Sequence, residues 1–194
     1  MIIGPSHFFS FSGLAAPDVR AFATPLGDMP LDAGAIETIA SMPQAVITDE
    51  PHEPEHAIEV ELPFLQVVLG AVPIVPLLVG RATAEEVAGV LDRLWDEPTL
   101  VVVSSDLSHY LGYEAAQEQD AATAAAIESF DGSRIGLTDA CGALPLRGLL
   151  LAAKRRGLTI QRLDLRNSGD TAGDPRRVVG YGAWVLHGRP PLAA

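Results

Sequence analysis

Cysteine is nearly absent from the sequence: Cys141 is the only one among 194 residues. A single cysteine cannot form an internal disulfide, so the chain is not a small extracellular scaffold held together by disulfides. The chain begins Met1-Ile2-Ile3-Gly4-Pro5, without the basic segment and long apolar segment of a secretory signal peptide. We therefore expect a reducing compartment, the cytoplasm.

Basic residues are scarce as well. Lys and Arg number 13 against 25 Asp and Glu, which gives a formal net charge of −12. Binding to nucleic acid draws much of its free energy from basic side chains on phosphates, and binding to anionic membrane surfaces depends on the same charges. We therefore expect neither nucleic acid nor a membrane surface as a partner.

A long uninterrupted hydrophobic run is also missing. The most apolar stretch, residues 62–80, is broken by Pro63, Pro73 and Pro76, and a proline inside a helix costs about 3 kcal/mol. This stretch predicts the end of a helix, a turn and a buried strand, not a membrane span. The chain shows no repeats, and its 48% hydrophobic residues suffice for a core, so we expect one domain over residues 1–194.

Hydrophobic patterning predicts strands that alternate with helices. Strands are expected at the start of the chain and at 19–23, 45–47, 72–79, 99–103, 158–165 and 178–186, and helices at 32–41, 55–69, 83–95, 114–130 and 146–156. Residues 8–17 are expected to form a loop. This alternation is typical of an α/β domain with a mostly parallel or mixed sheet.

The strand predicted at 99–103 ends in a polar cluster, in which Asp106 and His109 lie three residues apart. In open α/β sheets, ligand crevices lie at the carboxyl ends of strands. Asp106 would fix the tautomer of His109 and leave its other nitrogen for acid–base chemistry or ligation. The alternative is that Asp106 caps a turn and His109 is exposed. The pair alone leaves both interpretations open.

The segment His52-Glu53-Pro54-Glu55-His56 matches the H-E-x-x-H pattern of zinc proteases. That pattern requires both histidines on one helical face, and Pro54 disfavours a helix there. We expect His52 to be an exposed loop residue and His56 to lie near the start of a helix. Glu59 would then share its face and orient its imidazole, unless the two form an ordinary surface pair.

Cys141 lies in a polar, glycine-flanked segment just before a predicted helix. A lone cysteine is commonly a small buried hydrophobe, but a helix N-terminus can also stabilise a thiolate. His7 lies where the first strand runs into a loop, a common position for active-site groups.

Taken together, these fragments resemble the Memo family, called AmmeMemoRadiSam system protein B in bacteria and archaea, over essentially the whole chain. The matching segments, in family order, are Gly4-Pro5-Ser6-His7, His56-Ala57-Ile58-Glu59-Val60-Glu61-Leu62-Pro63, Ser104-Ser105-Asp106-Leu107-Ser108-His109-Tyr110, Cys141-Gly142 and Gly180-Tyr181-Gly182-Ala183. The resemblance implies a three-layer α/β/α sandwich, similar to the class III extradiol dioxygenases that bind non-haem iron.

The resemblance also implies a metal-capable pocket. His7 matches the second histidine ligand of the family and Cys141 its cysteine ligand. The accompanying pocket residues, which the resemblance implies for catalysis, are His56, Asp106, His109 and, behind His56, Glu59. A Cys/His set suits iron(II), copper or zinc, and composition does not choose among them.

The family's Pro-His-Ala-Gly-Tyr motif, which carries the first histidine ligand, does not occur in this sequence. We therefore expect a domain without the family's first strand and helix. Its site would be metal-free, would use His56 or His109 as a substitute ligand, or would be completed by a second copy or another partner chain. The function would be that of a metal-dependent oxidoreductase, a non-catalytic module that binds a peptide or small molecule, or, less favoured, a metal-dependent hydrolase.

Overall fold

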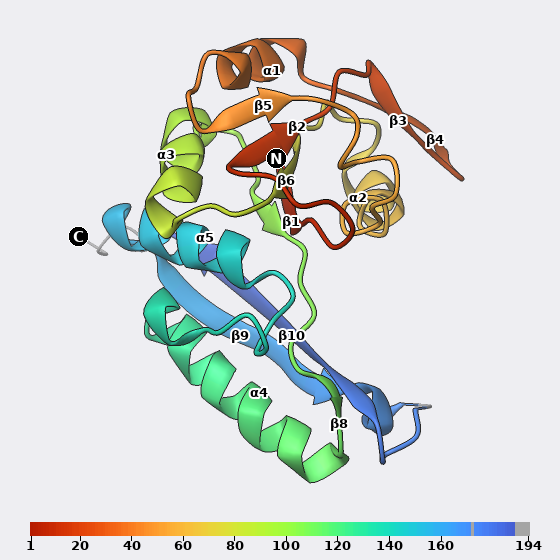
Figure 1. Cartoon of the computed structure of the whole chain (residues 1–194), viewed down its shortest axis with the longest axis vertical. Coiled ribbons are helices and arrows are strands. Elements are labelled where there is room, and N and C mark those ends of the chain that lie inside the picture. The colour runs from red at the N-terminus through yellow and green to blue at the C-terminus, as the bar shows by residue number, and fades with distance from the viewer. Residues whose placement is uncertain (172, 189–194) are drawn as a thin grey trace, which may run out of the picture. The chain divides into compact units, whose positions relative to one another are not determined.

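The computed structural model of the chain describes residues 1–171 and 173–188. These residues fall into two compact units, a first unit of Met1–Ser104 and a second unit that begins at Ser105 (Figure 1). The boundary separates the predicted strand at 99–103 from the polar residues that follow it. The prediction of a single domain over residues 1–194 stays a prediction.

The first unit is built on a five-stranded sheet in the order β5-β2-β6-β1-β7. Its strands are β1 (Ile2–Pro5), β2 (Leu14–Ala16), β5 (Ala45–Ile47), β6 (Pro76–Val79) and β7 (Val102–Val103). β1 pairs in parallel with both β6 and β7, whereas β2 is antiparallel to β6. Side chains on both faces of β1 and β6 are buried, which explains their continuous apolar sequences. The predicted α/β class with a mixed sheet is confirmed.

Three helices accompany this sheet: α1 (Ala33–Ala40), α2 (Leu62–Leu69) and α3 (Ala84–Leu94). Asp32 caps α1 by accepting a hydrogen bond from the backbone N–H of Ala35, and Thr83 forms a capping box with Glu86 at the start of α3. Asp32 and Thr83 are the first residues of the helices predicted at 32–41 and 83–95. In Figure 1, α2 and α3 lie on opposite sides of β1 and β6.

Two predictions about the first unit are wrong. The helix expected from residue 55 begins only at Leu62, because Pro63 occupies its first turn, where proline starts a helix rather than kinking it. The loop expected at 8–17 contains β2, which pairs with a strand on each side. The chain then forms a hairpin of β3 (Ala21–Thr24) and β4 (Gly27–Pro30).

The second unit is an antiparallel sheet of β8 (His109–Leu111), β10 (Val178–His187) and β9 (Thr159–Asn167), in that order. Helix α4 (Tyr113–Glu128) runs along β9 and β10, and α5 (Ala143–Arg155) belongs to the same unit (Figure 1). Leu107, Ile127 and Leu150 are fully buried in its core. Gly157, predicted to end α5, has a φ of 64°, which a side chain would disfavour.

The apolar stretch at 62–80 is divided between α2 and β6. Within the described residues, no helix has both the length and the apolar character needed to cross a lipid bilayer.

Candidate functional site

Among the described residues, two groups of side chains have donor atoms close enough to share a metal ion, and each group lies within one unit. We call His7, Glu55 and His56 the Glu55 cluster and Asp106, His109 and Cys141 the Cys141 cluster. In each, one donor atom per residue lies within 4.8 Å of the others. Five of these six residues are sites predicted from the sequence; Glu55 is not.

The Glu55 cluster is organised by a buried carboxylate whose side chain is 1% exposed. One oxygen accepts a hydrogen bond from the backbone N–H of His7 at 2.6 Å. The other lies 2.9 Å from the His7 ring nitrogen Nδ1 and accepts from the backbone N–H groups of His56 at 2.8 Å and Ala57 at 3.0 Å. Glu55 therefore holds the end of β1 and the turn at 55–57 together.

These bonds set the chemistry of the two imidazoles. A carboxylate only accepts hydrogen bonds, so Nδ1 of His7 donates to Glu55, and in the neutral form of the imidazole Nε2 then has the lone pair. The rings of His7 and His56 stack at 5.1 Å between centroids. Burial alone would raise the pKa of Glu55, but the hydrogen bonds from His7, His56 and Ala57 outweigh it and lower the pKa. Glu55 is thus a carboxylate that orients a histidine and stays ionised.

The Gly-Pro-Ser-His sequence has a structural reason. A Cβ added to Gly4 would lie 2.9 Å from the Cβ of Ala57, closer than side-chain carbons approach one another. Glycine at this position lets β1 run against the turn that carries Glu55 and His56. The strand then ends at Pro5, and His7 follows within reach of the carboxylate.

Glu59 and His52 are not among the donors of the Glu55 cluster. In the part of the chain that the structure describes, no hydrogen bond joins Glu59 to His56, and the carboxylate bonded to this histidine is Glu55. The prediction that His52 is exposed is wrong, since it is 7% exposed and its Nε2 lies 3.2 Å from the carbonyl oxygen of Ala15. The turns at 49–55 fold this ring onto β2, so His52 and His56 do not form a zinc protease pair.

In the Cys141 cluster, the loop before α5 is bonded to the segment after β7. The backbone N–H of Cys141 donates to the carbonyl of Asp106 at 3.2 Å, and the N–H of Gly142 donates to the hydroxyl of Ser105 at 2.9 Å. The thiol Sγ in turn accepts from the backbone N–H of Asp106 at 3.2 Å. These bonds hold Cys141 beside Asp106 across 35 residues of sequence.

The predicted pair of Asp106 and His109 is adjacent, with 3.6 Å between Oδ2 and Nε2. This distance is an ion-pair distance but is too long for a hydrogen bond. Backbone bonds position the segment: Leu107 donates to Gly180 at 2.9 Å, and the N–H of Ser108 donates to the buried carboxylate of Asp120 at 2.9 Å. The carboxylate of Asp106 and the imidazole of His109 therefore lie side by side without a hydrogen bond between them.

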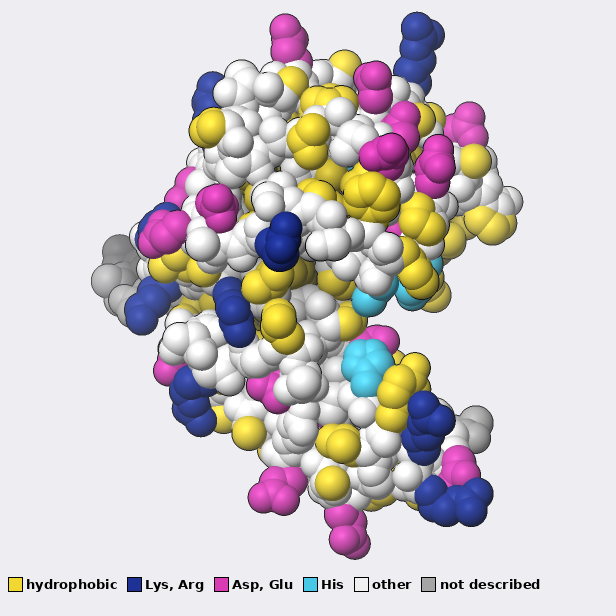
Figure 2. Space-filling model, in the orientation of Figure 1, with side chains coloured by type: hydrophobic (Ala, Val, Ile, Leu, Met, Phe, Trp, Pro, Cys, Tyr) yellow, Lys and Arg dark blue, Asp and Glu magenta, His cyan; other side chains and the backbone are white. Residues whose placement is uncertain are grey.

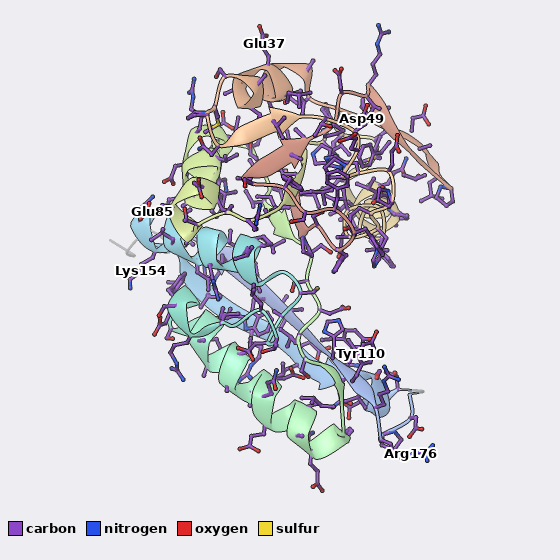
Figure 3. The ribbon with its side chains drawn as sticks, in the orientation of Figure 1. Glu37, Asp49, Glu85, Tyr110, Lys154 and Arg176 are labelled. Carbon is purple, nitrogen blue, oxygen red and sulfur yellow. The ribbon has the colours of Figure 1, made fainter. Side chains whose placement is uncertain are left out.

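Tyr110 follows His109 on β8 (Figure 3). Its ring lies 5.7 Å from the ring of His109, and the guanidinium carbon of Arg177 lies 4.2 Å above the Tyr110 ring centroid.

Burial and the nearby charge of Asp106 raise the pKa of the Cys141 thiol, against hydrogen bonds from Asp106, Ser105 and Gly142 that lower it. The free side chain is therefore a thiol at neutral pH. A thiol, an imidazole and a carboxylate supply the sulfur, nitrogen and oxygen donors that zinc and iron(II) accept, and a bound ion would displace the thiol proton. The donor set of the Cys141 cluster fits such an ion.

The two metal ligands predicted from the sequence lie in different units, His7 in the first and Cys141 in the second. Each has its own neighbours, Glu55 for His7 and Asp106 for Cys141. That His7 and Cys141 share one ion stays a prediction.

Comparison with known proteins identifies the family. The family model described as Memo-like protein matches residues 1–185. A MEMO1 family protein from Aeropyrum pernix is 34% identical, over 94% of this chain and 70% of its own length. Proteins of the same name from Thermotoga maritima and Aquifex aeolicus are each 32% identical, over 96% and 93% of this chain and 70% and 72% of their own lengths. The chain belongs to the Memo-like family.

Proposed function

We propose that this Memo-like protein binds one divalent transition metal ion, iron(II), copper or zinc, and that its iron or copper form carries out oxidoreductase chemistry on a small molecule. The observation that carries the proposal is the Cys141 cluster, in which three different donor types lie within 4.8 Å of one another. When bound, iron or copper would supply electron transfer to an oxidant such as dioxygen.

The chain's own residues would hold and orient that ion. Cys141 would bind as a thiolate, with the backbone N–H of Asp106 donating to its sulfur. His109 and Asp106 would complete the donor set or, where one of them stays free of the ion, transfer a proton at the imidazole Nε2. In the first unit, Glu55 would keep Nε2 of His7 available as a ligand or base.

Metal content tests the first half of the proposal. Purified protein reconstituted with iron(II), copper or zinc should retain about one ion per chain after dialysis, because a closed set of three ligands binds tightly. Cys141→Ala and His109→Ala should lose it. His187→Ala is the matched control, since His187 is an exposed histidine outside both clusters. Retention of the ion by Cys141→Ala would contradict the assignment.

His7→Ala is a separate arm of the same measurement. Loss of the ion in this variant would make His7 a ligand alongside the Cys141 cluster. Full retention of the ion by His7→Ala would show that His7 is not a ligand, and its role would then be acid–base chemistry or substrate binding.

The reaction class is tested by two assays on the loaded protein. Dioxygen consumption with catechols as probe substrates supports the oxidoreductase assignment. Hydrolysis of simple esters by the zinc form, without dioxygen consumption by the iron form, would assign a metal-dependent hydrolase instead.

A further inference from the structure

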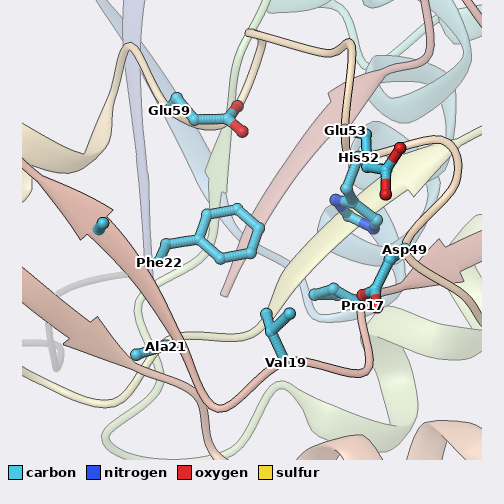
Figure 4. Close-up of a pocket in the computed structure, with 9 residues that line it drawn as sticks. Pro17, Val19, Ala21, Phe22, Asp49, His52, Glu53 and Glu59 are labelled. Carbon is cyan, nitrogen blue, oxygen red and sulfur yellow. The ribbon is translucent and has the colours of Figure 1, made fainter.

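The first unit contains a cavity of about 340 Å³ that belongs to neither cluster of donor atoms (Figure 4). We call it the acidic cavity. It is lined by Pro17, Val19, Ala21, Phe22, Ala23, Asp49, His52, Glu53 and Glu59. All of these residues lie in the first unit.

One wall of the acidic cavity is apolar. Pro17 and Val19 follow β2, and Phe22 lies on β3. The ring of Phe22 meets the ring of His52 edge to face, with 6.0 Å between centroids. This wall offers hydrocarbon and one aromatic ring to a ligand.

The polar residues that line the cavity offer hydrogen-bond acceptors. The Nε2 of buried His52 lies against the carbonyl of Ala15, so this nitrogen carries the proton and Nδ1 has the lone pair. Burial lowers the pKa of His52, which keeps the ring neutral. Among the described residues Nδ1 has no hydrogen-bond partner. Asp49 and Glu53 add carboxylates beside His52, and Glu59 adds one on the side of Phe22 (Figure 4).

No basic side chain neutralises these carboxylates: neither Lys nor Arg lines the cavity. Asp49 accepts one backbone hydrogen bond, from Asp18 at 2.7 Å, and no side-chain bond is formed by Glu53 or Glu59 within the described ranges. Burial and the charge of nearby Glu55 raise the pKa of Glu59. Acidic side chains also dominate the charged surface seen in Figure 2. The cavity therefore concentrates negative charge next to an apolar wall.

We propose that the acidic cavity binds a small organic cation, an alkylammonium or alkylguanidinium ion with a short hydrocarbon part. The cation would donate to Glu59, Glu53 and Nδ1 of His52, and Phe22 would contact its hydrocarbon part or its charge. A bare metal ion fits less well, because these donors are not among the described groups that converge within 4.8 Å. The volume lies in the lower range of small-molecule sites.

The test is a titration of ¹⁵N-labelled protein, followed by amide chemical shifts, with n-butylammonium and n-butylguanidinium chloride in 0.15 M NaCl. Salt at this level screens attraction beyond about 8 Å, so the net charge alone should not produce binding. We expect saturable shifts at Ala21 and Ala23 with a Kd of about 1 mM, the range of a ligand with few atoms. Uncharged n-butanol and anionic butyrate should give no saturable shifts.

Glu59→Gln should weaken binding of the cations about tenfold, because one charge-assisted hydrogen bond is lost. Glu53→Gln tests a second lining carboxylate, at an exposed position where folding is not at risk. Glu50→Gln is the matched control, because it removes the same charge beside Asp49 but does not line the cavity.

Three results would overturn the proposal: no saturable shift with either cation, equal binding of n-butanol, or equal weakening by Glu50→Gln. The blocked tripeptide acetyl-Gly-Arg-Gly-amide separates a free cation from an arginine side chain. Tighter binding of this tripeptide than of n-butylguanidinium would overturn the assignment to a free small molecule. The titration uses metal-free protein, so its result does not depend on the proposed metal chemistry.

Discussion

The two clusters contain similar donors but are built in opposite ways. At the centre of the Glu55 cluster is a carboxylate with 1% side-chain exposure that accepts bonds from three backbone N–H groups and one imidazole. At the centre of the Cys141 cluster is a half-buried thiol, and the adjacent His109 and Asp106 are 3.6 Å apart. The first cluster is satisfied by the protein itself, whereas the second keeps donors available for a ligand.

The pKa directions follow from this difference. Burial opposes ionisation at both centres, yet the hydrogen bonds to Glu55 outweigh it and lower its pKa. For Cys141, burial and the charge of Asp106 outweigh the hydrogen bonds to the sulfur, and the pKa is raised. Glu55 therefore positions its neighbours without a ligand, while Cys141 needs a cation to become a thiolate.

The largest expected effect is on folding. Glu55→Ala leaves the buried N–H group of Ala57 and the part-buried N–H groups of His7 and His56 without their charged acceptor, and we expect a loss of about 3–5 kcal/mol in the free energy of unfolding. Asp106→Ala removes a partly exposed side chain and should cost less than about 1 kcal/mol. Urea denaturation measures both.

The two tryptophans let each unit report separately. Trp95 lies in the first unit and Trp184 in the second, so fluorescence in a Trp184→Phe background follows the first unit and the converse background follows the second. Glu50→Gln controls for the charge change in the same loop. Similar losses for Glu55→Ala and Asp106→Ala would remove the distinction between the clusters.

Lowering the pH should reveal the contribution of Glu55 to the stability of the first unit. The lowered pKa of Glu55 means that the folded state binds this proton less readily than the unfolded state, so its contribution to stability is present above about pH 4.5 and is lost as pH falls through the lowered pKa. Stability of the first unit should therefore fall more steeply between pH 5 and 3 in wild type than in Glu55→Gln. Parallel curves from urea denaturation would show that Glu55 is not the linked group.

Much of this arrangement was predictable from local sequence, because the capping residues Asp32 and Thr83 and the strand ends before His7 and Asp106 act through neighbours in the chain. The parts that were missed depend on distant contacts. β2 exists because β5 and β6 pair with it on both sides. Glu55 acquires its role only when β1 approaches the turn at Ala57 through Gly4. His52 is buried for a similar reason, since its partner Ala15 lies 37 residues away.

The chemistry of the thiol gives a smaller effect that probes the Cys141 cluster directly. In metal-free protein, Asp106→Asn removes a charge that raises the pKa of Cys141, so iodoacetamide should react about threefold faster at pH 8. Ser105→Ala removes a hydrogen bond that lowers the pKa and should slow the reaction. The pH at the midpoint of the rate–pH curve should be lowest for Asp106→Asn, intermediate for wild type and highest for Ser105→Ala. A reversed order would mean that access to the sulfur, not charge, controls its reactivity.

The smallest expected effect concerns Glu59, a carboxylate of the first unit without the donors that surround Glu55. Burial and the charge of Glu55 raise its pKa, so the ionised form destabilises the folded state at neutral pH, and this cost disappears as pH falls through the raised pKa. Glu59→Gln should therefore raise the free energy of unfolding at pH 7 by up to about 0.5 kcal/mol, with no gain at pH 4. Urea denaturation at both pH values measures this difference, and a loss of stability at pH 7 would contradict it. Glu59→Gln therefore separates two predicted effects of one carboxylate, a cost to folding and a gain in binding the proposed organic cation.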